Sequence, residues 1–162
     1  MPTKSPTKNP TKKPTTASPT KTTTGSCTFE TKDLCGWSVP KGGKGKWLRG
    51  TTTPSYSTGA AKGYGGKGYF MFLETSSPSK KGDTSYIQHP VRAGYKSMSF
   101  RYHMHGATMG ALKVDALVGS KWTTIFKEEG QANFKKQTAA FRLAKARLPA
   151  PLSAALRECM VA

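Results

Sequence analysis

Thiols and imidazoles are the side chains of this sequence that could do chemistry, and their spacing is informative. Cys27 and Cys35 lie eight positions apart in a stretch rich in Gly and Thr, and Cys159 stands far downstream. This pattern favours a small disulfide loop in a secreted protein over a metal site in a cytosolic one. His103 and His105 would point to one face of a strand and could contact a metal ion. No third ligand accompanies them, so we expect no metal site.

Catalytic arrangements are not recognisable. The sequence has no Ser, His and acid set and no pair of carboxylates at helix or strand spacing. The run from Gly63 to Gly68 lacks the Lys-Ser or Lys-Thr ending of a phosphate-binding loop and is predicted to be a hairpin loop. The sequence therefore predicts a binding protein that is not an enzyme and needs no cofactor.

The elements that must position these residues are predicted to be short strands. Apolar and polar residues alternate in short runs that are separated by Gly, Pro, Ser and Lys clusters, and helical periodicity is absent. In one run, Met98, Phe100, Tyr102 and Met104 share a face. Several strands at this spacing predict an antiparallel sandwich. The predicted strands are 69–74, 85–89, 98–104, 111–118 and 121–126.

Composition divides the chain of 162 residues into three segments. Residues 1–26 repeat Pro-Thr-Lys and predict a disordered linker, which would be an O-glycosylated stalk outside the cell. Residues 27–136 hold the predicted strands. Residues 137–162 are rich in Ala, Leu, Arg and Lys, which predicts a tail that is irregular or forms short helices broken at its prolines. No apolar run is long enough for a transmembrane helix, and the first residues lack the apolar core of an export signal.

Seven short pieces of sequence occur in an informative order. They begin with Cys27-Thr28-Phe29-Glu30 and continue through Leu34-Cys35-Gly36-Trp37 to Tyr102-His103-Met104 and Gly106. Together they resemble the MAM domain, an extracellular β-sandwich module of adhesion receptors and secreted multidomain proteins. The resemblance covers about residues 27–131. The positions that it marks as structural are Phe29, Trp37, Trp47, Tyr102, His103, Met104 and Gly106.

The resemblance implies an all-β, antiparallel sandwich of jelly-roll type and a disulfide between Cys27 and Cys35. By the chain-entropy estimate, such a short loop stabilises the fold by about 2.5 kcal/mol. The third cysteine of the family falls at Ser97, so Cys159 is left as a free thiol or for a bond between molecules. The closing strands of the family are not recognisable after Gln131, so we expect an incomplete sandwich with exposed sheet edges.

These features together predict an extracellular module for protein–protein interaction and cell adhesion. Its partner would be another extracellular protein or a domain of the same family, and its parent protein would be secreted or membrane-anchored. The net charge of +18 favours polyanions as neighbours. One alternative is therefore a module that binds sulfated glycans, and a second is an intracellular basic protein that binds nucleic acid or another polyanion through its tail. The predicted glycan contacts are Lys41, Lys44, Lys46, Lys62 and Lys67.

Overall fold

Strands form most of the regular structure in the part of the chain that the structure describes. The computed structural model describes residues 25–90, 95–130 and 141–149, and the backbone of residues 152–161. Two short 3-10 turns, η1 (Leu34–Gly36) and η2 (Tyr64–Gly66), accompany the strands. The strands are β1 (Lys46–Gly50), β2 (Phe70–Glu74), β3 (Thr84–Pro90), β4 (Ser97–Tyr102), β5 (Ala111–Val118), β6 (Lys121–Glu129), β7 (Arg142–Arg147) and β8 (Leu152–Val161). None of the described residues lies in a helix long and apolar enough to cross a membrane.

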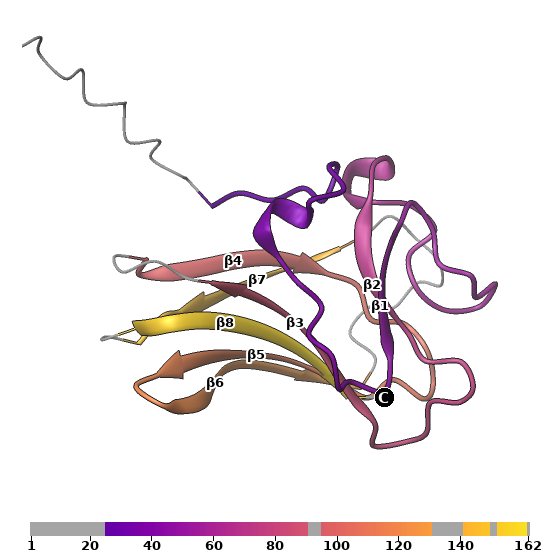
Figure 1. Ribbon diagram of the computed structural model, residues 1–162. Helices are drawn as coiled ribbons and strands as arrows, with labels where there is room; N and C mark the ends of the chain where they lie inside the picture. The colour runs from indigo at the N-terminus through magenta and orange to yellow at the C-terminus, as the bar shows by residue number, and fades with distance from the viewer. Residues whose placement is uncertain (1–24, 91–94, 131–140, 150–151, 162) are drawn as a thin grey trace, which may run out of the picture.

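The strands are arranged in two layers (Figure 1). One layer is a four-stranded sheet in the order β3-β8-β5-β6, and the two-stranded sheet β4-β7 lies across it. A second two-stranded sheet, β1-β2, stands at one end of the molecule. Every strand pair is antiparallel. The predicted all-β antiparallel sandwich is therefore confirmed.

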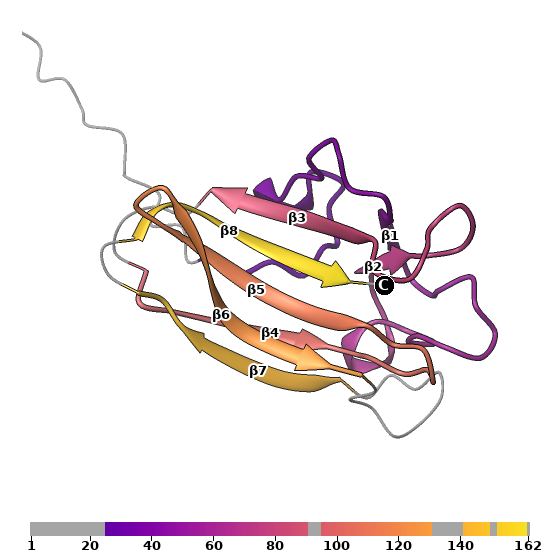
Figure 2. The same ribbon diagram turned by 90° about the horizontal axis from the view of Figure 1, so that it is seen from below.

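The alternation of side chains explains how these layers pack. In β4, the apolar residues Met98 and Phe100 and the buried Tyr102 face the four-stranded sheet, where they contact a core that includes Leu112 and Val114. Strand β5 is buried on both faces at its centre, as expected for an inner strand. It turns into β6 at Gly119, whose φ of 62° suits a tight hairpin. Figure 2 shows β5 and β6 lying across β4 and β7.

A polar contact also joins the layers at the edge of the core. The Tyr102 hydroxyl donates to the Glu128 carboxylate over 2.9 Å, and Arg142 lies 3.7 Å from the same carboxylate. Burial, followed by the hydrogen bond to Glu128, raises the pKa of Tyr102. The three residues belong to β4, β6 and β7, so this contact fixes the packing of three strands that are distant in sequence.

The predicted helical or irregular tail over 137–162 is wrong for the described residues. Residues 142–147 and 152–161 are strands: β7 pairs with β4, and β8 lies between β3 and β5. The reason lies in periodicity, because Ala144 and Ala146 are buried while Lys145 and Arg147 are exposed. This alternation of two belongs to a strand, although each residue alone is a good helix former. The sandwich is therefore more complete than expected.

Candidate functional site

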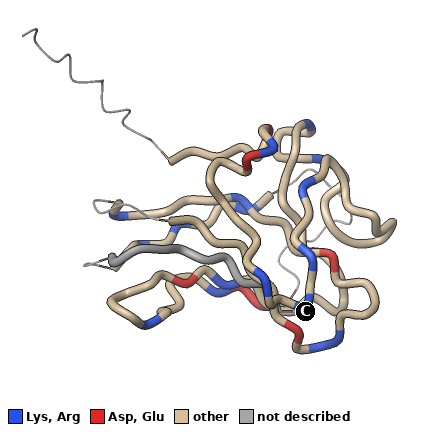
Figure 3. Tube along the Cα trace, in the orientation of Figure 1, with Lys and Arg blue, Asp and Glu red and all other residues tan. Residues whose placement is uncertain are grey.

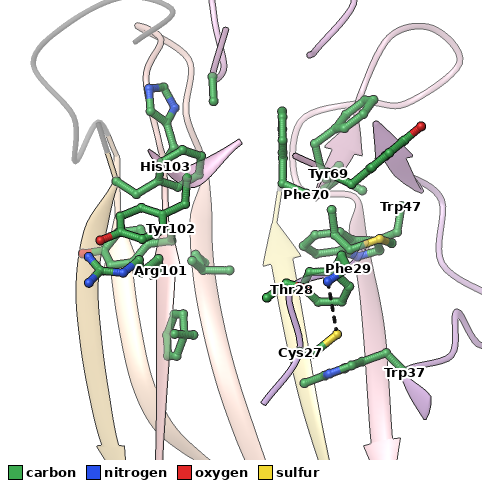
Figure 4. Close-up of a pocket in the computed structure, with 18 of the residues that line it drawn as sticks. Cys27, Thr28, Phe29, Trp37, Trp47, Tyr69, Phe70, Arg101, Tyr102 and His103 are labelled. Carbon is green, nitrogen blue, oxygen red and sulfur yellow. Dashed lines mark hydrogen bonds between the residues drawn. The ribbon is translucent and has the colours of Figure 1, made fainter. Parts of the chain in front are cut away.

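The segment before β1 is a loop closed by a disulfide. Cys27 and Cys35 are bonded, with their Cα atoms 5.7 Å apart, which confirms the predicted bridge. The Phe29 amide donates to the Cys27 sulfur over 3.4 Å (Figure 4). Phe29 and Cys35 both have positive φ, a conformation that side chains rarely adopt without support. The bridge supplies part of that support, so the loop is a fixed structure beside the sandwich.

Asp33 organises the turn inside this loop. Its carboxylate accepts hydrogen bonds from the Thr31 hydroxyl over 2.5 Å and from the Cys35 amide over 3.1 Å. The Thr31 hydroxyl and then the Cys35 amide lower the pKa of Asp33. Asp33 therefore stays ionised and holds the turn next to the disulfide.

Arg49 on β1 attaches the loop to the β1-β2 sheet. Its Nε donates to the Phe29 carbonyl over 2.6 Å, and its Nη2 donates to the Glu30 carbonyl over 2.5 Å. The guanidinium lies 3.4 Å from the centroid of the Tyr69 ring, a cation–π contact. The Glu30 carboxylate completes the attachment by accepting a hydrogen bond from the Tyr69 amide over 3.0 Å. A side chain at position 68, where the chain has Gly, would collide with the Glu30 carboxylate.

A cleft of about 1500 Å³ separates this assembly from the β4-β7 sheet. Figure 4 shows the two walls facing each other across open space. One wall carries Phe29, Trp47, Tyr69 and Phe70, and the other carries Arg101, Tyr102 and His103. The lining includes eleven Phe, Tyr and Trp rings, which come from strands and loops that are far apart in sequence.

Two open strand edges border the cleft. Within the described part of the chain, β2 is hydrogen-bonded to β1 alone and β4 to β7 alone. Every residue of β2 and of β4 lines the cleft, although neighbours in a strand point to opposite faces. Both edges must therefore face into the cleft, where their backbone groups can pair with an added strand. All five residues of β2 are half-buried, because one side of this apolar strand borders the cleft.

The lining also carries charge of both signs. Glu30 and Glu74 contribute carboxylates, and Lys67 and Arg101 contribute cations. The hydroxyl and then the amide of Ser76 donate to Glu74 and lower its pKa, so this carboxylate is ionised at neutral pH. An apolar cleft with a few charges of both signs suits a segment of another protein better than a small charged metabolite.

His103 lies in the cleft wall with its ring nitrogens buried. Neither nitrogen has a hydrogen-bond partner in the described part of the chain, and Phe141 packs edge-on against the ring at 5.8 Å between centroids. His105 is 6.5 Å away between centroids, and no group of three or more metal-binding side chains occurs among the described residues. Burial, and then the charge of His105, lower the pKa of His103.

This pKa predicts a pH-dependent stability. The folded state holds neutral His103, whereas the unfolded chain takes up a proton near pH 6.5, about the ordinary value for His. The free energy of unfolding should fall as the pH drops from about 7.5 through 6.5, and level off below the folded pKa. Urea unfolding at a series of pH values measures this. His103→Phe should flatten the dependence between about pH 5 and 7.5, and an unchanged slope would show that His103 is not its source.

Most of the residues marked as structural are in or near the core. Trp47, Tyr102 and Met104 are buried. Gly106 is buried with a φ of 149°, next to Thr58. Trp37 lies apart from this core, half-buried against the His89 ring at 5.2 Å between centroids. His89 in turn contacts the Cys35 carbonyl over 3.2 Å, so Trp37 packs at the junction of the disulfide loop and β3.

The predicted glycan contacts are exposed but do not form a single cluster by position. Lys44 lies 3.6 Å from Asp83, and Lys46 is opposite Glu74 in the β1-β2 register. Lys62 and Lys67 flank η2, in the loop between β1 and β2 and close to the start of β2. Lys41 lies in the turn before β1. Their role in binding polyanions stays a prediction.

The backbone at Cys159 lies in β8 opposite Tyr86 and Lys113, but its side chain is outside the described structure, so the free thiol also stays a prediction.

Sequence reasoning missed the cleft and part of what builds it. The contacts of Arg49 to the disulfide loop depend on the fold. Phe141 was assigned to the tail, yet its ring packs against Tyr64 at 6.2 Å, Phe70 at 6.2 Å and His103 at 5.8 Å. The sequence did offer one signal for this: small and charged residues alternate after Phe141, from Ala144 to Arg147, which is the period of a strand.

Comparisons with known proteins agree with this architecture. The family model described as "MAM domain, meprin/A5/mu" matches residues 27–149. MAM domain-containing glycosylphosphatidylinositol anchor protein 1 of Gallus gallus is 34% identical over 109 residues, covering 61% of this chain and 12% of that protein. Thyroid hormone-induced protein B of Xenopus laevis is 36% identical over 94 residues, covering 56% of this chain and 14% of that protein. This chain thus spans about a seventh or less of either relative.

A solved structure has the same fold at low sequence identity. The crystal structure of the K2 cleaved adhesin domain of Lys-gingipain matches with a TM-score of 0.60 and 13% identity. The match covers 83% of this chain and 88% of that domain. At this identity the likeness concerns the fold alone, and it supports a β-sandwich that includes most of the chain.

Proposed function

The chain belongs to the MAM domain family, whose model matches more than half of its residues, and from this premise we propose that it is an extracellular module for protein–protein interaction and cell adhesion. The family is a non-catalytic module that also occurs in meprin proteases. The name of one relative places that protein on a glycosylphosphatidylinositol anchor. We propose that this chain likewise acts outside the cell, as part of a larger secreted or membrane-anchored protein.

The observation that carries the proposal is the aromatic cleft with its two open strand edges. An extended segment of a partner protein could add a strand to the free edge of β4 or β2 and gain main-chain hydrogen bonds there. Its side chains would pack among the rings that line the cleft, and aromatic rings dominate the energetics of protein interfaces. The disulfide and the Arg49 contacts hold one wall of the cleft in place, so that wall loses less conformational entropy when a partner binds.

Two exposed tyrosines of the cleft provide the test. Tyr64 and Tyr69 line the cleft and are 56% and 39% exposed, so the part of each ring that is not stacked on Arg101 or Arg49 is open to a partner. Beads coated with the full chain should adhere to one another or to a layer of epithelial cells. Tyr64→Ser combined with Tyr69→Ser should reduce that adhesion by at least about tenfold, because each anchor residue at an interface contributes on the order of 2 kcal/mol.

The matched control is Tyr56→Ser. Tyr56 is 86% exposed but does not line the cleft, so its replacement removes one highly exposed ring elsewhere, against the two partly exposed rings of the cleft variant. Adhesion by this variant should equal that of the unmodified chain. An equal loss in both variants, or no loss in the double variant, would argue against the cleft as the binding surface. Circular dichroism of each variant checks that the fold is retained.

A further inference from the structure

One face of the β4-β7 sheet points away from the core, and it borders the cleft at Ser97, Ser99 and Arg101 but not at Lys145 and Arg147. Met98, Phe100 and Tyr102 of β4 face the core, so Ser97, Ser99 and Arg101 project from the opposite side. In β7, Ala144 and Ala146 are buried, whereas Leu143, Lys145 and Arg147 are exposed. We call the set of Arg101, Lys145 and Arg147, with the serines Ser97 and Ser99 beside them, the basic strip.

The strand register places these residues in a regular array. Ser97 is opposite Arg147, Ser99 is opposite Lys145, and Arg101 is opposite Leu143. Residues directly opposite one another lie about 5 Å apart, and the next same-face pair lies about 7 Å further along the strands. The basic strip is therefore about 14 Å long and two strands wide, with hydroxyl donors next to two of its three cations.

Among the described side chains, no carboxylate is paired with the charges of the basic strip. β4 and β7 contain no Asp or Glu, and Figure 3 shows Lys and Arg without acidic positions along their traces. Among the described residues, none of the three cations is in a salt bridge. This distinguishes the strip from Lys44, which lies beside Asp83, and from Lys46, which is opposite Glu74.

Arg101 is held in place at one end of the strip. Its guanidinium lies 3.9 Å from the centroid of the Tyr64 ring, and Tyr64 packs edge-on against Phe141. A stacked guanidinium keeps its donors oriented and loses less freedom on binding an anion. Lys62 and Lys67, two of the predicted polyanion contacts, flank Tyr64 in sequence.

We propose that the basic strip binds a sulfated polysaccharide that lies along β4 and β7. A linear polymer with regularly spaced sulfates meets cations and hydroxyl donors at regular intervals, and such contacts do not require a deep pocket. Binding of single-stranded nucleic acid relies on rings on which successive bases stack, and the strip borders one such ring, Tyr64, at its Arg101 end. The choice of a sulfated glycan over other polyanions also rests on the proposed extracellular location.

Heparin is the probe for the test, with the full chain as the protein. Lys145→Gln combined with Arg147→Gln removes two charges from the basic strip. The matched control, Lys80→Gln combined with Lys81→Gln, removes two charges from an exposed turn before β3. We expect the strip variant to bind heparin at least about tenfold more weakly, with the slope of log affinity against log salt reduced by about two. The control should change affinity by less than about threefold, and both variants should unfold at the temperature of the unmodified chain.

Two results would overturn the proposal. Equal losses in the two variants would show that heparin responds to net charge, including that of residues 1–24, and not to the strip. Displacement of heparin by single-stranded DNA at the same concentration of charge, as effective as displacement by free heparin, would overturn the assignment to a sulfated glycan. The heparin measurement uses the chain without a protein partner, and its variants at Lys145 and Arg147 lie outside the lining of the cleft. Failure of the strip variant to weaken heparin binding would therefore leave the adhesion proposal standing, and failure of the coated beads to adhere would leave heparin binding by the strip standing.

Discussion

Ala144→Asp is expected to lower the free energy of unfolding by about 3 kcal/mol or more. Ala144 is 6% exposed and packs with Tyr102, Met104 and Leu112 between the two sheets. A carboxylate at this position would be buried without a partner, which destabilises proteins by about 3 kcal/mol or more. Single domains are stable by about 5–15 kcal/mol in total, so one substitution would remove a large part of the margin. Urea unfolding followed by tryptophan fluorescence measures the loss.

The neighbouring residue provides a stringent control for this prediction. Leu143 is 53% exposed and lies opposite Arg101, so Leu143→Asp should lower stability by less than about 1 kcal/mol. A strand with one buried face requires this difference in sensitivity between adjacent positions. If both variants lost the same stability, residues 142–147 would not be a strand with one buried face.

Leu156→Pro should be nearly as disruptive, for a reason that lies in the backbone. Residue 156 is at the middle of β8, opposite His89 of β3 on one side and Ala116 of β5 on the other. Proline cannot donate to the ladder, and its ring does not fit an inner strand. The lost hydrogen bond and the unsatisfied acceptor together destabilise the sheet by at least about 2 kcal/mol.

Proline at the start of the same strand should be tolerated better. Leu152 is the first residue of β8 and, among the described residues, pairs with Val118 alone. The first residue of a strand is a position at which proline is found. Thermal unfolding of both variants gives the comparison. A similar loss in melting temperature for both positions would contradict an inner position for the middle of β8.

The central strands could be predicted because each carries its own pattern. Strand β5 begins and ends where the alternation over 111–118 begins and ends, and Met98, Phe100 and Tyr102 face the core as their spacing implies. Each pattern lies within one strand, so the strand can be predicted without knowing which other strand it pairs with. The predicted strands at 69–74, 85–89 and 121–126 correspond to β2, β3 and β6 for the same reason.

The C-terminal strands were missed because composition and periodicity pointed in different directions. Ala, Leu, Arg and Lys favour helices when summed, but tertiary pairing overrides such a weak preference. Ala144 and Ala146 fit between the sheets because they are small, and the long side chains of Lys145 and Arg147 remain in solvent. The resemblance also ended near Gln131, whereas the family match extends to residue 149.

The cleft could not have been predicted from local patterns. Its walls combine Phe29, Phe70, Tyr102 and Phe141, which are brought together by strand pairings between distant parts of the chain. Whether a strand has an open edge depends on which strands lie beside it, and the sequence of one strand does not show its neighbours. The same holds for the basic strip, because Arg101 and Lys145 belong to strands that the sequence analysis did not pair.

Hydrogen–deuterium exchange of the unmodified chain tests the central claim most directly, namely that β8 completes the four-stranded sheet while β2 and β4 leave their edges open to the cleft. Amides of residues 152–161 should exchange as slowly as those of β5, because both strands are paired on two sides. In β2 and β4, slow and fast amides should alternate, because one side of each strand is unpaired. Fast exchange throughout residues 152–161, or uniform protection along β2 and β4, would contradict the account.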